Sequence, residues 1–382
     1  MYLDEAILDD TARIDTGDAA ALLPHIASAA LQVRQSAVLA QEAGVARLGA
    51  DGRPRAVLVA GVGGSSLAAG ILAAVAGPAG PVPVIGHHAH GLPGWVGVSD
   101  VVLAVSASGT STETCSVVEE AHRRGARIGV VAPADTPLAH LAALAGASFV
   151  PLVGQRPARA MLWSLAVPLL VAAQALGVVR LGDDAVEAAA ARLEEVATRC
   201  RSSSESFVNP AKTLALELAG ALPVIWGTSV VTAVAAEHAA AQFATNAKYP
   251  VLVGALPHPG HHQVALFDGP FGAGLGVADS GGGDELENFF RDRAEEEKST
   301  RLRLILLRDP DAERAEVTRQ AEVAVAVAAE RGVGVTELRT EGSGPLERLA
   351  SLIGLFDFTA VYLALVLGLD PAQVPAARDL GR

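Results

Sequence analysis

Cysteine is scarce in this sequence. The 382 residues include only two, Cys115 and Cys200. Two cysteines are too few for a disulfide framework or for a cysteine-based metal site. A reducing compartment is the simplest setting for such a chain, and the acidic first 18 residues contain no apolar signal-peptide core. We therefore expect a cytoplasmic protein.

Aromatic residues are also few, at 4 % of the chain, although hydrophobic residues of all kinds reach 51 %. The high hydrophobic content excludes disorder as the main state. The low aromatic content means that the core is built from Ala, Val and Leu. Ala-rich helices and Val-rich strands are typical of an α/β protein.

Positively charged residues are fewer than negatively charged ones. The chain contains 29 Lys and Arg and 42 Asp and Glu, which gives a net charge of −13. Nucleic acids and anionic membranes are bound by basic surfaces, so we expect neither as a partner. The net charge does not exclude a small anionic ligand, because helix dipoles act locally.

The apolar run at 161–179 is interrupted by Ser164, Pro168 and Gln174, and it predicts a buried core helix rather than a membrane span.

Short apolar runs alternate with helix-like segments in two successive stretches. Strands are predicted at 56–60, 82–85, 101–105, 127–131 and 147–152, and again at 223–227, 251–254, 302–307 and 333–338. This spacing predicts an α/β fold with doubly wound parallel sheets. We expect an N-terminal helical segment at 1–50, a first sheet domain at 51–155, connecting helices at 156–201 and a second sheet domain with a C-terminal helix at 202–382.

A turn crowded with hydroxyl groups, the serine turn (Ser106–Thr114, SASGTSTET), follows the predicted strand at 101–105 and precedes a helix-like run. The first N–H groups of a helix lack internal partners, and the helix dipole favours an anion there. One hydroxyl suffices for a simple N-cap, whereas this turn carries six. We therefore favour a phosphate ester over a cap. The predicted ligands in this turn are Ser106, Ser108, Gly109, Thr110, Ser111 and Thr114.

A second turn, the glycine turn (Gly61–Ser66, GVGGSS), follows the strand at 56–60. Its glycines could serve only a tight turn. A dinucleotide site is disfavoured, because the third fingerprint glycine and the acidic residue after the next strand are both missing. We expect the turn to approach the phosphate from the other side. The predicted contacts are Gly63, Gly64, Ser65 and Ser66.

The second half repeats the arrangement of strand, hydroxyl turn and helix in weaker form at Thr228-Ser229, which suggests a duplication. An irregular stretch at 254–283 carries His258, His261 and His262 and ends in a glycine run. The histidines lack a helical i, i+4 pair and an obvious carboxylate partner, so we expect no metal site there.

The glycine turn and the pattern S-x-S-G-x-[ST]-x-E-T of the serine turn resemble a sugar isomerase (SIS) domain. Further segments resemble the bifunctional phosphoglucose/phosphomannose isomerase family of SIS proteins; they lie at 157–160 (PARA), 209–212 (NPAK), 242–250 (QFATNAKYP), 256–264 (LPHPGHHQV) and 370–371 (DP). The resemblance spans roughly residues 55–382. It implies two flavodoxin-like SIS domains, a homodimer, and interconversion of glucose or mannose 6-phosphate with fructose 6-phosphate without metal or cofactor.

The resemblance also implies roles for single residues. Ser65, Ser106, Ser108 and Ser111 would hold the phosphate, in agreement with the expectation for the two turns. Arg159 would lie near the sugar, where a fixed cation stabilises an enediolate, and His261 would help to open the sugar ring.

Three positions depart from the family pattern. The catalytic Glu of the family corresponds to Thr245, its C-terminal Lys to Gly381 with Arg382 beside it, and an Arg ahead of the Glu motif to His238. A threonine hydroxyl does not ionise near neutral pH, and a positioned base contributes about 10²–10⁴-fold to such reactions. The candidates for a replacement base are Glu237, His238, His258, His261 and His262.

Three hypotheses follow. The chain is a phosphosugar isomerase with a substitute base; or it is a phosphosugar-binding sensor or regulator that has lost the activity; or it isomerises another sugar phosphate, such as that of a heptose or an amino sugar. Fold alone does not choose between an enzyme and a sensor.

Overall fold

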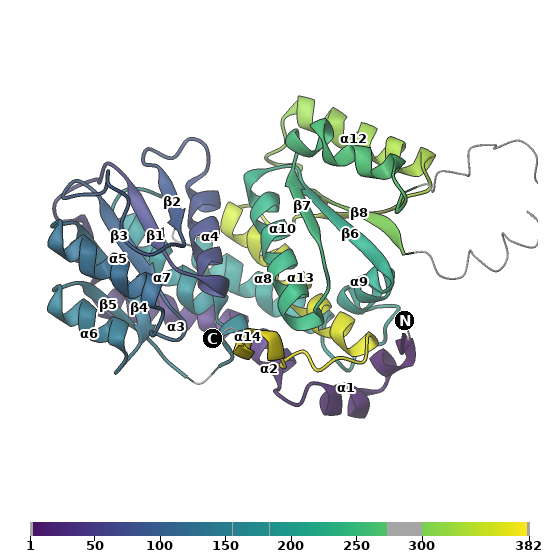
Figure 1. Ribbon diagram of the computed structural model, residues 1–382, viewed down its shortest axis with the longest axis horizontal. Helices are drawn as coiled ribbons and strands as arrows, with labels where there is room; N and C mark the ends of the chain where they lie inside the picture. Colours follow the sequence, from purple (N-terminus) through teal and green to yellow (C-terminus); the bar gives the residue numbers. More distant parts are fainter. Residues whose placement is uncertain (1–2, 155, 183, 273–299, 380–382) are drawn as a thin grey trace, which may run out of the picture. The chain divides into compact units, whose positions relative to one another are not determined.

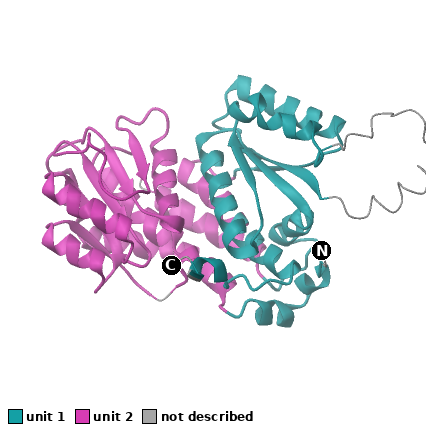
Figure 2. Ribbon diagram, in the orientation of Figure 1, with its two compact units in different colours: residues 1–19, 202–340, 356–382 teal, residues 20–201, 341–355 magenta. Residues whose placement is uncertain are grey.

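The computed structural model describes residues 3–154, 156–182, 184–272 and 300–379. They form two compact units (Figure 2): unit 1 comprises Met1–Ala19, Ser202–Thr340 and Phe356–Arg382, and unit 2 comprises Ala20–Arg201 and Glu341–Leu355. Helix α13 (Pro345–Val366) contributes its first part to unit 2 and its second part to unit 1.

Unit 2 is built on a five-stranded parallel sheet in the order β2-β1-β3-β4-β5. The strands are β1 (Val57–Ala60), β2 (Val84–His87), β3 (Val101–Val105), β4 (Arg127–Pro133) and β5 (Ser148–Leu152). All residues of β1 and β3 are buried, as expected for central strands that are covered on both faces. The predicted doubly wound parallel sheet is confirmed.

Helices cover both faces of this sheet (Figure 1). Helices α5 (Thr112–Arg123) and α6 (Pro137–Leu144) pack on Leu58, Val102 and Val130 and their neighbours. The other face is covered by α3 (Ala29–Glu42), α4 (Leu67–Ala76) and α7 (Leu162–Ala175), and the short α2 (Leu22–Ala27) and the amphipathic α8 (Ala185–Arg199) complete the helices of unit 2.

Unit 1 contains a four-stranded parallel sheet in the order β7-β6-β8-β9. The strands are β6 (Ala221–Gly227), β7 (Leu252–Ala255), β8 (Arg301–Arg308) and β9 (Gly334–Arg339), and the helices are α1 (Thr11–Gly17), α9 (Pro210–Leu218), α10 (Val230–Gln242), α12 (Ala315–Glu330) and α14 (Pro375–Asp379). Helix α12 lies on one face of the sheet, and α9 and α10 lie on the other (Figure 1).

The strand orders of the two units correspond. In chain order, unit 1 follows the pattern 2-1-3-4 and unit 2 follows 2-1-3-4-5. Strand β6 is therefore the counterpart of β1, and β8 is the counterpart of β3. The turn after β6 (Thr228-Ser229) thus corresponds to the glycine turn, and the turn after β8 corresponds to the serine turn.

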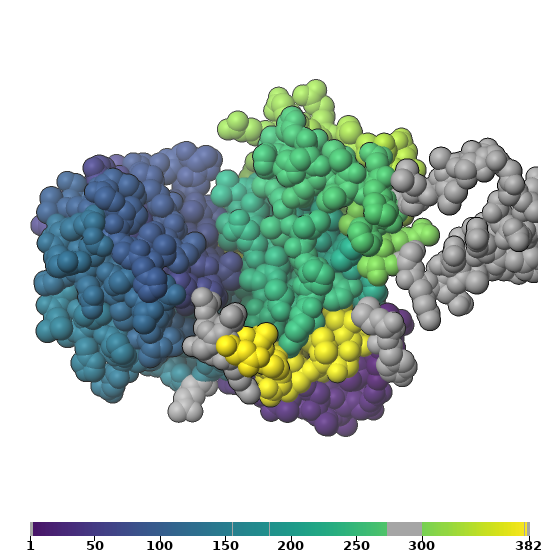
Figure 3. Space-filling view, in the orientation of Figure 1, coloured from purple at the N-terminus to yellow at the C-terminus, as the bar shows by residue number. Residues whose placement is uncertain are grey.

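The N-terminal segment belongs to unit 1 through contacts with distant parts of the chain. Figure 3 shows it, in purple, beside the yellow C-terminal residues, where the N–H of Asp4 donates to the carbonyl of Val366 at 2.9 Å. The buried ammonium group of Lys212 donates to the carbonyls of Leu8, Ser202 and Ser204. All three of its donors are used, so the buried charge has main-chain partners in place of a carboxylate.

The two long apolar helices are core helices. The predicted helix at 161–179 is observed as α7, of which eleven residues are buried, Pro168 included. Helix α13 has the length and composition of a membrane span, but 94 % of its most apolar 18-residue window is buried inside the protein. Burial against other elements accounts for its apolar composition.

The part of α13 that belongs to unit 1 contributes Phe356 to the core of that unit. This side chain is fully buried and meets Phe243 edge to face, with 6.0 Å between ring centroids. We expect Phe356→Ala to lower the free energy of unfolding in urea by about 3–5 kcal/mol, because it leaves a cavity. The matched control is Phe207→Ala at a side chain that is 77 % exposed, where a change within about 0.5 kcal/mol is expected. Equal effects of the two changes would contradict this account of the core.

Candidate functional site

The glycine turn and the serine turn lie side by side at the carboxyl edge of the sheet in unit 2, because β1 and β3 are adjacent parallel strands. Ligands of doubly wound sheets bind at this edge. A hydrogen bond joins the two turns: the N–H of Ala107 donates to Oγ of the buried Ser65 at 3.3 Å.

Hydroxyl groups shape the serine turn from within. Oγ of Ser106 accepts from the N–H of Gly109 at 3.0 Å, and Oγ of Ser108 accepts from the N–H of Thr110 at 3.2 Å. Ser111 is the N-cap of α5 and accepts from the N–H of Thr114 at 3.3 Å. The N-cap interpretation therefore describes Ser111. Oγ of Ser106 and Oγ of Ser108 lie 3.4 Å apart, so one of these hydroxyls donates to the other and the pair has one proton left to donate elsewhere.

Main-chain donors of this turn are free. Among the described residues, the N–H groups of Ser108, Ser111 and Thr112 have no hydrogen-bond acceptor. They belong to the turn and to the first residue of α5, where the helix dipole is positive. Free N–H groups together with hydroxyls and without a cationic side chain are the usual composition of a phosphate cradle at a helix N-terminus.

Gly109 keeps the turn in this conformation. Its φ is +68°, and a Cβ atom at this position would lie 2.3 Å from Oγ1 of Thr136. Thr136 is itself fixed, because its hydroxyl donates to the carbonyl of Pro133 and caps α6. Both the left-handed conformation and the close approach to Thr136 require glycine.

In the counterpart turns of unit 1, the hydroxyl groups donate to carboxylates of the protein itself. Oγ of Ser229 donates to Asp309 at 2.6 Å, and Oγ1 of Thr228 donates to Glu313 at 2.6 Å. Burial opposes ionisation of Glu313, but hydrogen bonds from Arg308, Thr228 and the N–H of Asp309 outweigh it and lower the pKa of Glu313 to about 2. Two carboxylates stand where an anion would bind, so the repeated hydroxyl turn is not a second phosphate site.

The remaining phosphate contacts predicted from sequence are also in unit 2. The four residues Gly63–Ser66 form a 3-10 turn directly after β1, in which the Ser66 hydroxyl donates to the carbonyl of Gly63. Arg159 lies, partly buried, on a 3-10 turn (Ala158–Ala160) ahead of α7. The structure thus brings the glycine and serine turns together and places Arg159 in the same unit.

The catalytic candidates lie in unit 1. The hydroxyl of Thr245 donates to the carbonyl of Ala241 at 2.6 Å, one turn back along its own helix. Glu237 is exposed on α10, and desolvation by the surrounding protein raises the pKa of its carboxyl group. His238 is fully buried, with Nε2 at 2.6 Å from Asp357 and with no partner for Nδ1 among the described residues. Arg382 and the glycine run at 281–283 lie outside the described residues.

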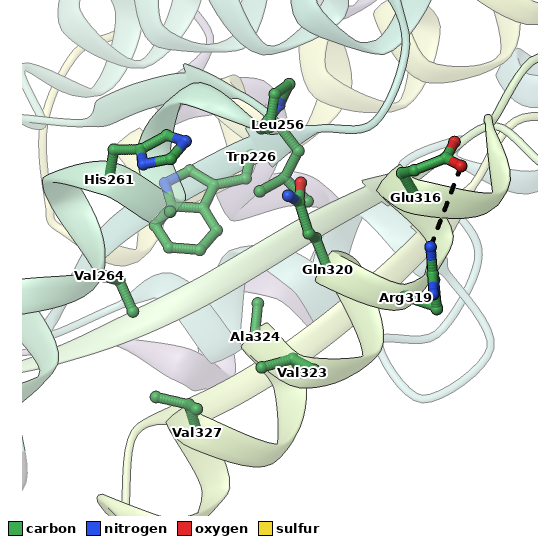
Figure 4. Close-up of a pocket in the computed structure, with 12 residues that line it drawn as sticks. Trp226, Leu256, His261, Val264, Glu316, Arg319, Gln320, Val323, Ala324 and Val327 are labelled. Carbon is green, nitrogen blue, oxygen red and sulfur yellow. Dashed lines mark ion pairs between the residues drawn. The ribbon is translucent and has the colours of Figure 1, made fainter.

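His261 lines a cavity of about 510 Å³ (Figure 4). Figure 4 shows its ring facing Trp226 and, across the cavity, Gln320 of α12, with the Glu316–Arg319 ion pair at the rim. The rest of the cavity lining is apolar and consists of Val, Leu and Ala side chains with Pro257 and Gly260. The rings of His258 and His262 contact each other, with 4.5 Å between centroids. No group of metal-ligating side chains occurs among the described residues.

Sequence reasoning missed the segment that runs from the last residue of β2 to the Leu92-Pro93 dipeptide. It carries His87, His88 and His90 in the run GHHAHG at the carboxyl end of a strand. That position was the available signal, because carboxyl ends of parallel strands meet at one edge of the sheet.

Known proteins resemble this chain in sequence. Residues 207–381 match the family model of the bacterial phospho-glucose isomerase C-terminal SIS domain. The bifunctional phosphoglucose/phosphomannose isomerase of Caldicellulosiruptor bescii is 27 % identical over 320 residues, which cover 83 % of this chain and 86 % of that protein.

Two solved structures share the fold. A hypothetical protein of Thermus thermophilus superposes with a TM-score of 0.67 at 15 % identity, covering 98 % of this chain and 93 % of that one. A protein of Silicibacter pomeroyi named as a candidate phosphosugar isomerase superposes with a TM-score of 0.61 at 20 % identity, covering 92 % and 99 %. The predicted α/β fold with two SIS-type sheets is confirmed.

The geometry of the serine turn predicts a cost for Gly109→Ala. A left-handed non-glycine residue and the contact with Thr136 together should lower the free energy of unfolding by about 1–3 kcal/mol. The control is Gly94→Ala, where an added Cβ meets no atom within 4 Å and a change within about 0.5 kcal/mol is expected. Urea unfolding of both variants checks this; a neutral Gly109→Ala would mean that the turn adopts another conformation.

The lowered pKa of Glu313 predicts that the stability of the protein depends on pH. Its folded pKa is about 2, below the ordinary value of 4.5, so its stabilising contribution is present above about pH 4.5 and is lost as the pH falls towards 2. The difference in unfolding free energy between the wild type and Glu313→Gln should therefore shrink by about 3 kcal/mol between pH 5 and pH 2. Glu322→Gln, at an exposed position of α12, should show a constant difference. A constant difference for Glu313→Gln as well would refute the assigned network.

Proposed function

This chain is a divergent member of the bifunctional phosphoglucose/phosphomannose isomerase family of SIS-domain proteins, and we propose that it binds a hexose 6-phosphate at the serine turn and interconverts its aldose and ketose forms. The substrates are glucose 6-phosphate and mannose 6-phosphate, and the product of both is fructose 6-phosphate. The named relative from Caldicellulosiruptor bescii is a phosphoglucose and phosphomannose isomerase.

One observation carries this proposal: the serine turn presents three free N–H groups beside the hydroxyls of Ser106 and Ser108. A phosphate group has oxygens for several such donors, and the helix dipole adds to their attraction. The hydroxyl of Ser65 borders the same edge through its bond to Ala107. These contacts hold the phosphate end of the ligand and leave the sugar end to other residues.

The reaction needs a group that moves a proton between C1 and C2 of the open-chain sugar. Thr245 does not supply it. Its hydroxyl does not ionise near neutral pH and is held by a hydrogen bond to the carbonyl of Ala241, so it does not act as a proton acceptor. Glu237 is a better candidate in unit 1, because desolvation raises the pKa of its carboxyl group. His261 remains the proposed ring-opening residue.

The alternative function is a phosphosugar-binding sensor or regulator without turnover. The orientation of the Thr245 hydroxyl favours it, since the position that carries the family base has no base here. Both functions use the same phosphate site. We further propose that the chain is a cytoplasmic homodimer that acts without metal or cofactor, and these properties belong to the proposal in both forms.

A charge reversal at the cradle tests the phosphate site. We expect Ser108→Asp to abolish the rise in melting temperature that glucose 6-phosphate causes in the wild type, because a carboxylate beside the free N–H groups repels phosphate and takes up its donors. The control is Ser99→Asp, at an exposed position before β3, which should retain the rise. A coupled assay for fructose 6-phosphate on the same proteins separates isomerase from sensor. Binding that survives in Ser108→Asp would show that the phosphate lies elsewhere.

A further inference from the structure

Three histidines lie next to the proposed phosphate site on one short segment, the histidine loop (His87–Leu92), which begins at the last residue of β2 in unit 2. Two of them fix the loop to main-chain carbonyls. Nδ1 of His88 lies 2.8 Å from the carbonyl oxygen of Gly61, the first residue of the glycine turn. Nε2 of His87 lies 2.8 Å from the carbonyl oxygen of Gly91 within the loop. Each bond occupies one ring nitrogen as a donor.

The far end of the loop is fixed to α5. The N–H of Gly91 donates to Oγ of Ser116 at 3.0 Å, and the N–H of Leu92 donates to Glu120 at 2.8 Å. The loop therefore spans from the glycine turn to the helix that begins at the serine turn. Bonds at both ends hold its middle residues in a defined position above this edge of the sheet.

His90 is the histidine that this anchoring presents to solvent. Its side chain is 64 % exposed, and its Nε2 lies 4.0 Å from Oε1 of Glu113. The other oxygen of Glu113 accepts from the hydroxyl of Ser111 at 3.0 Å and from that of Thr112 at 3.4 Å. An imidazole, a carboxylate and a hydroxyl of the serine turn thus follow one another. At 4.0 Å the Glu113 carboxylate neighbours the imidazole without a hydrogen bond to it. An exposed imidazole beside a carboxylate at a ligand-binding edge has the composition of a general-base site.

The geometry points to His90 as the group that transfers the proton in the isomerisation, in the role that the family gives to a glutamate; this inference rests on the proposed function. The C–H bond at C2 of the open-chain aldose breaks, and His90 takes the proton. The electron pair forms the C1–C2 double bond of an enediolate while the carbonyl π pair moves to O1. The proton returns to C1, and the hydroxyl proton at O2 passes to O1, which gives the ketose. No external oxidant or reductant is needed.

Four of the other residues considered for this role are less suited to it. The hydroxyl of Thr245 is bonded within its own helix, and His238 is fully buried. His87 and His88 each use a ring nitrogen to bind a carbonyl, which makes them positioning residues for the loop. Glu237 lies in unit 1 and is the rival that the experiment has to separate from His90.

The test follows the proton directly. Full-length protein is incubated with fructose 6-phosphate in D₂O, and NMR measures deuterium entering C1. The rise in melting temperature with fructose 6-phosphate is measured in parallel as a readout of binding. We expect His90→Gln to slow the exchange at least about 100-fold, the low end for loss of a general base, and to keep the melting shift. His140→Gln on α6, an exposed histidine of the same unit, should leave both unchanged.

Each other outcome has a separate meaning. Exchange that persists in His90→Gln and disappears in Glu237→Gln overturns the role of His90 and leaves the isomerase function intact. Loss of the melting shift in His90→Gln also overturns it, because the residue would then bind the phosphate. Wild-type protein that binds without exchange overturns it in favour of the sensor. Wild-type protein that does not bind removes the proposed function and this inference together.

Discussion

The unfilled N-terminus of α5 is the feature on which the candidate site depends. A helix that begins at the carboxyl end of a buried strand leaves N–H groups without partners, and these groups require an acceptor from solvent, side chains or a ligand. In unit 2 the carboxylate of Glu113 accepts from the hydroxyls of Ser111 and Thr112, but among the described residues no acceptor reaches the N–H groups of Ser108 and Ser111. The donors are left open to an external anion.

In unit 1 the donors of the corresponding turns have acceptors within the protein. Its strand order repeats that of unit 2, so the turns after β6 and β8 occupy the corresponding edge. Here Asp309 and Glu313 accept from Ser229 and Thr228, and Arg308 balances the charge of Glu313. Internal carboxylates stabilise the turn and exclude an anion. One architecture therefore yields an open cradle in one unit and a closed, structural network in the other.

In the proposed function, phosphate binding and proton transfer fall to different residues, so that one can be lost while the other is kept. The proposed phosphate donors are mostly main-chain N–H groups, which any sequence compatible with the serine turn retains. The proposed proton transfer depends on a single side chain. The hydroxyl of Thr245, which the resemblance places at the position of the family base, donates to the carbonyl of Ala241. The histidine loop shows how a base could be supplied from the phosphate-binding unit itself, held by main-chain bonds to Gly61 and by contacts with α5.

The sequence by itself determined the parallel sheets, the core helices and the serine turn, because these depend on local patterns: apolar runs such as 101–105, turn residues such as Gly109, and a cap such as Ser111. It could not determine which distant side chains form hydrogen bonds with the hydroxyls of a turn. Thr228-Ser229 looks like a weaker serine turn, and only the tertiary structure brings Asp309 and Glu313, 80 and 85 residues further along the chain, onto its hydroxyls. The histidine loop is the same case, since His90 and Glu113 meet only because the carboxyl end of β2 and the start of α5 lie at one edge of the sheet. Local signals follow from neighbouring residues, whereas contacts between distant segments follow from strand order.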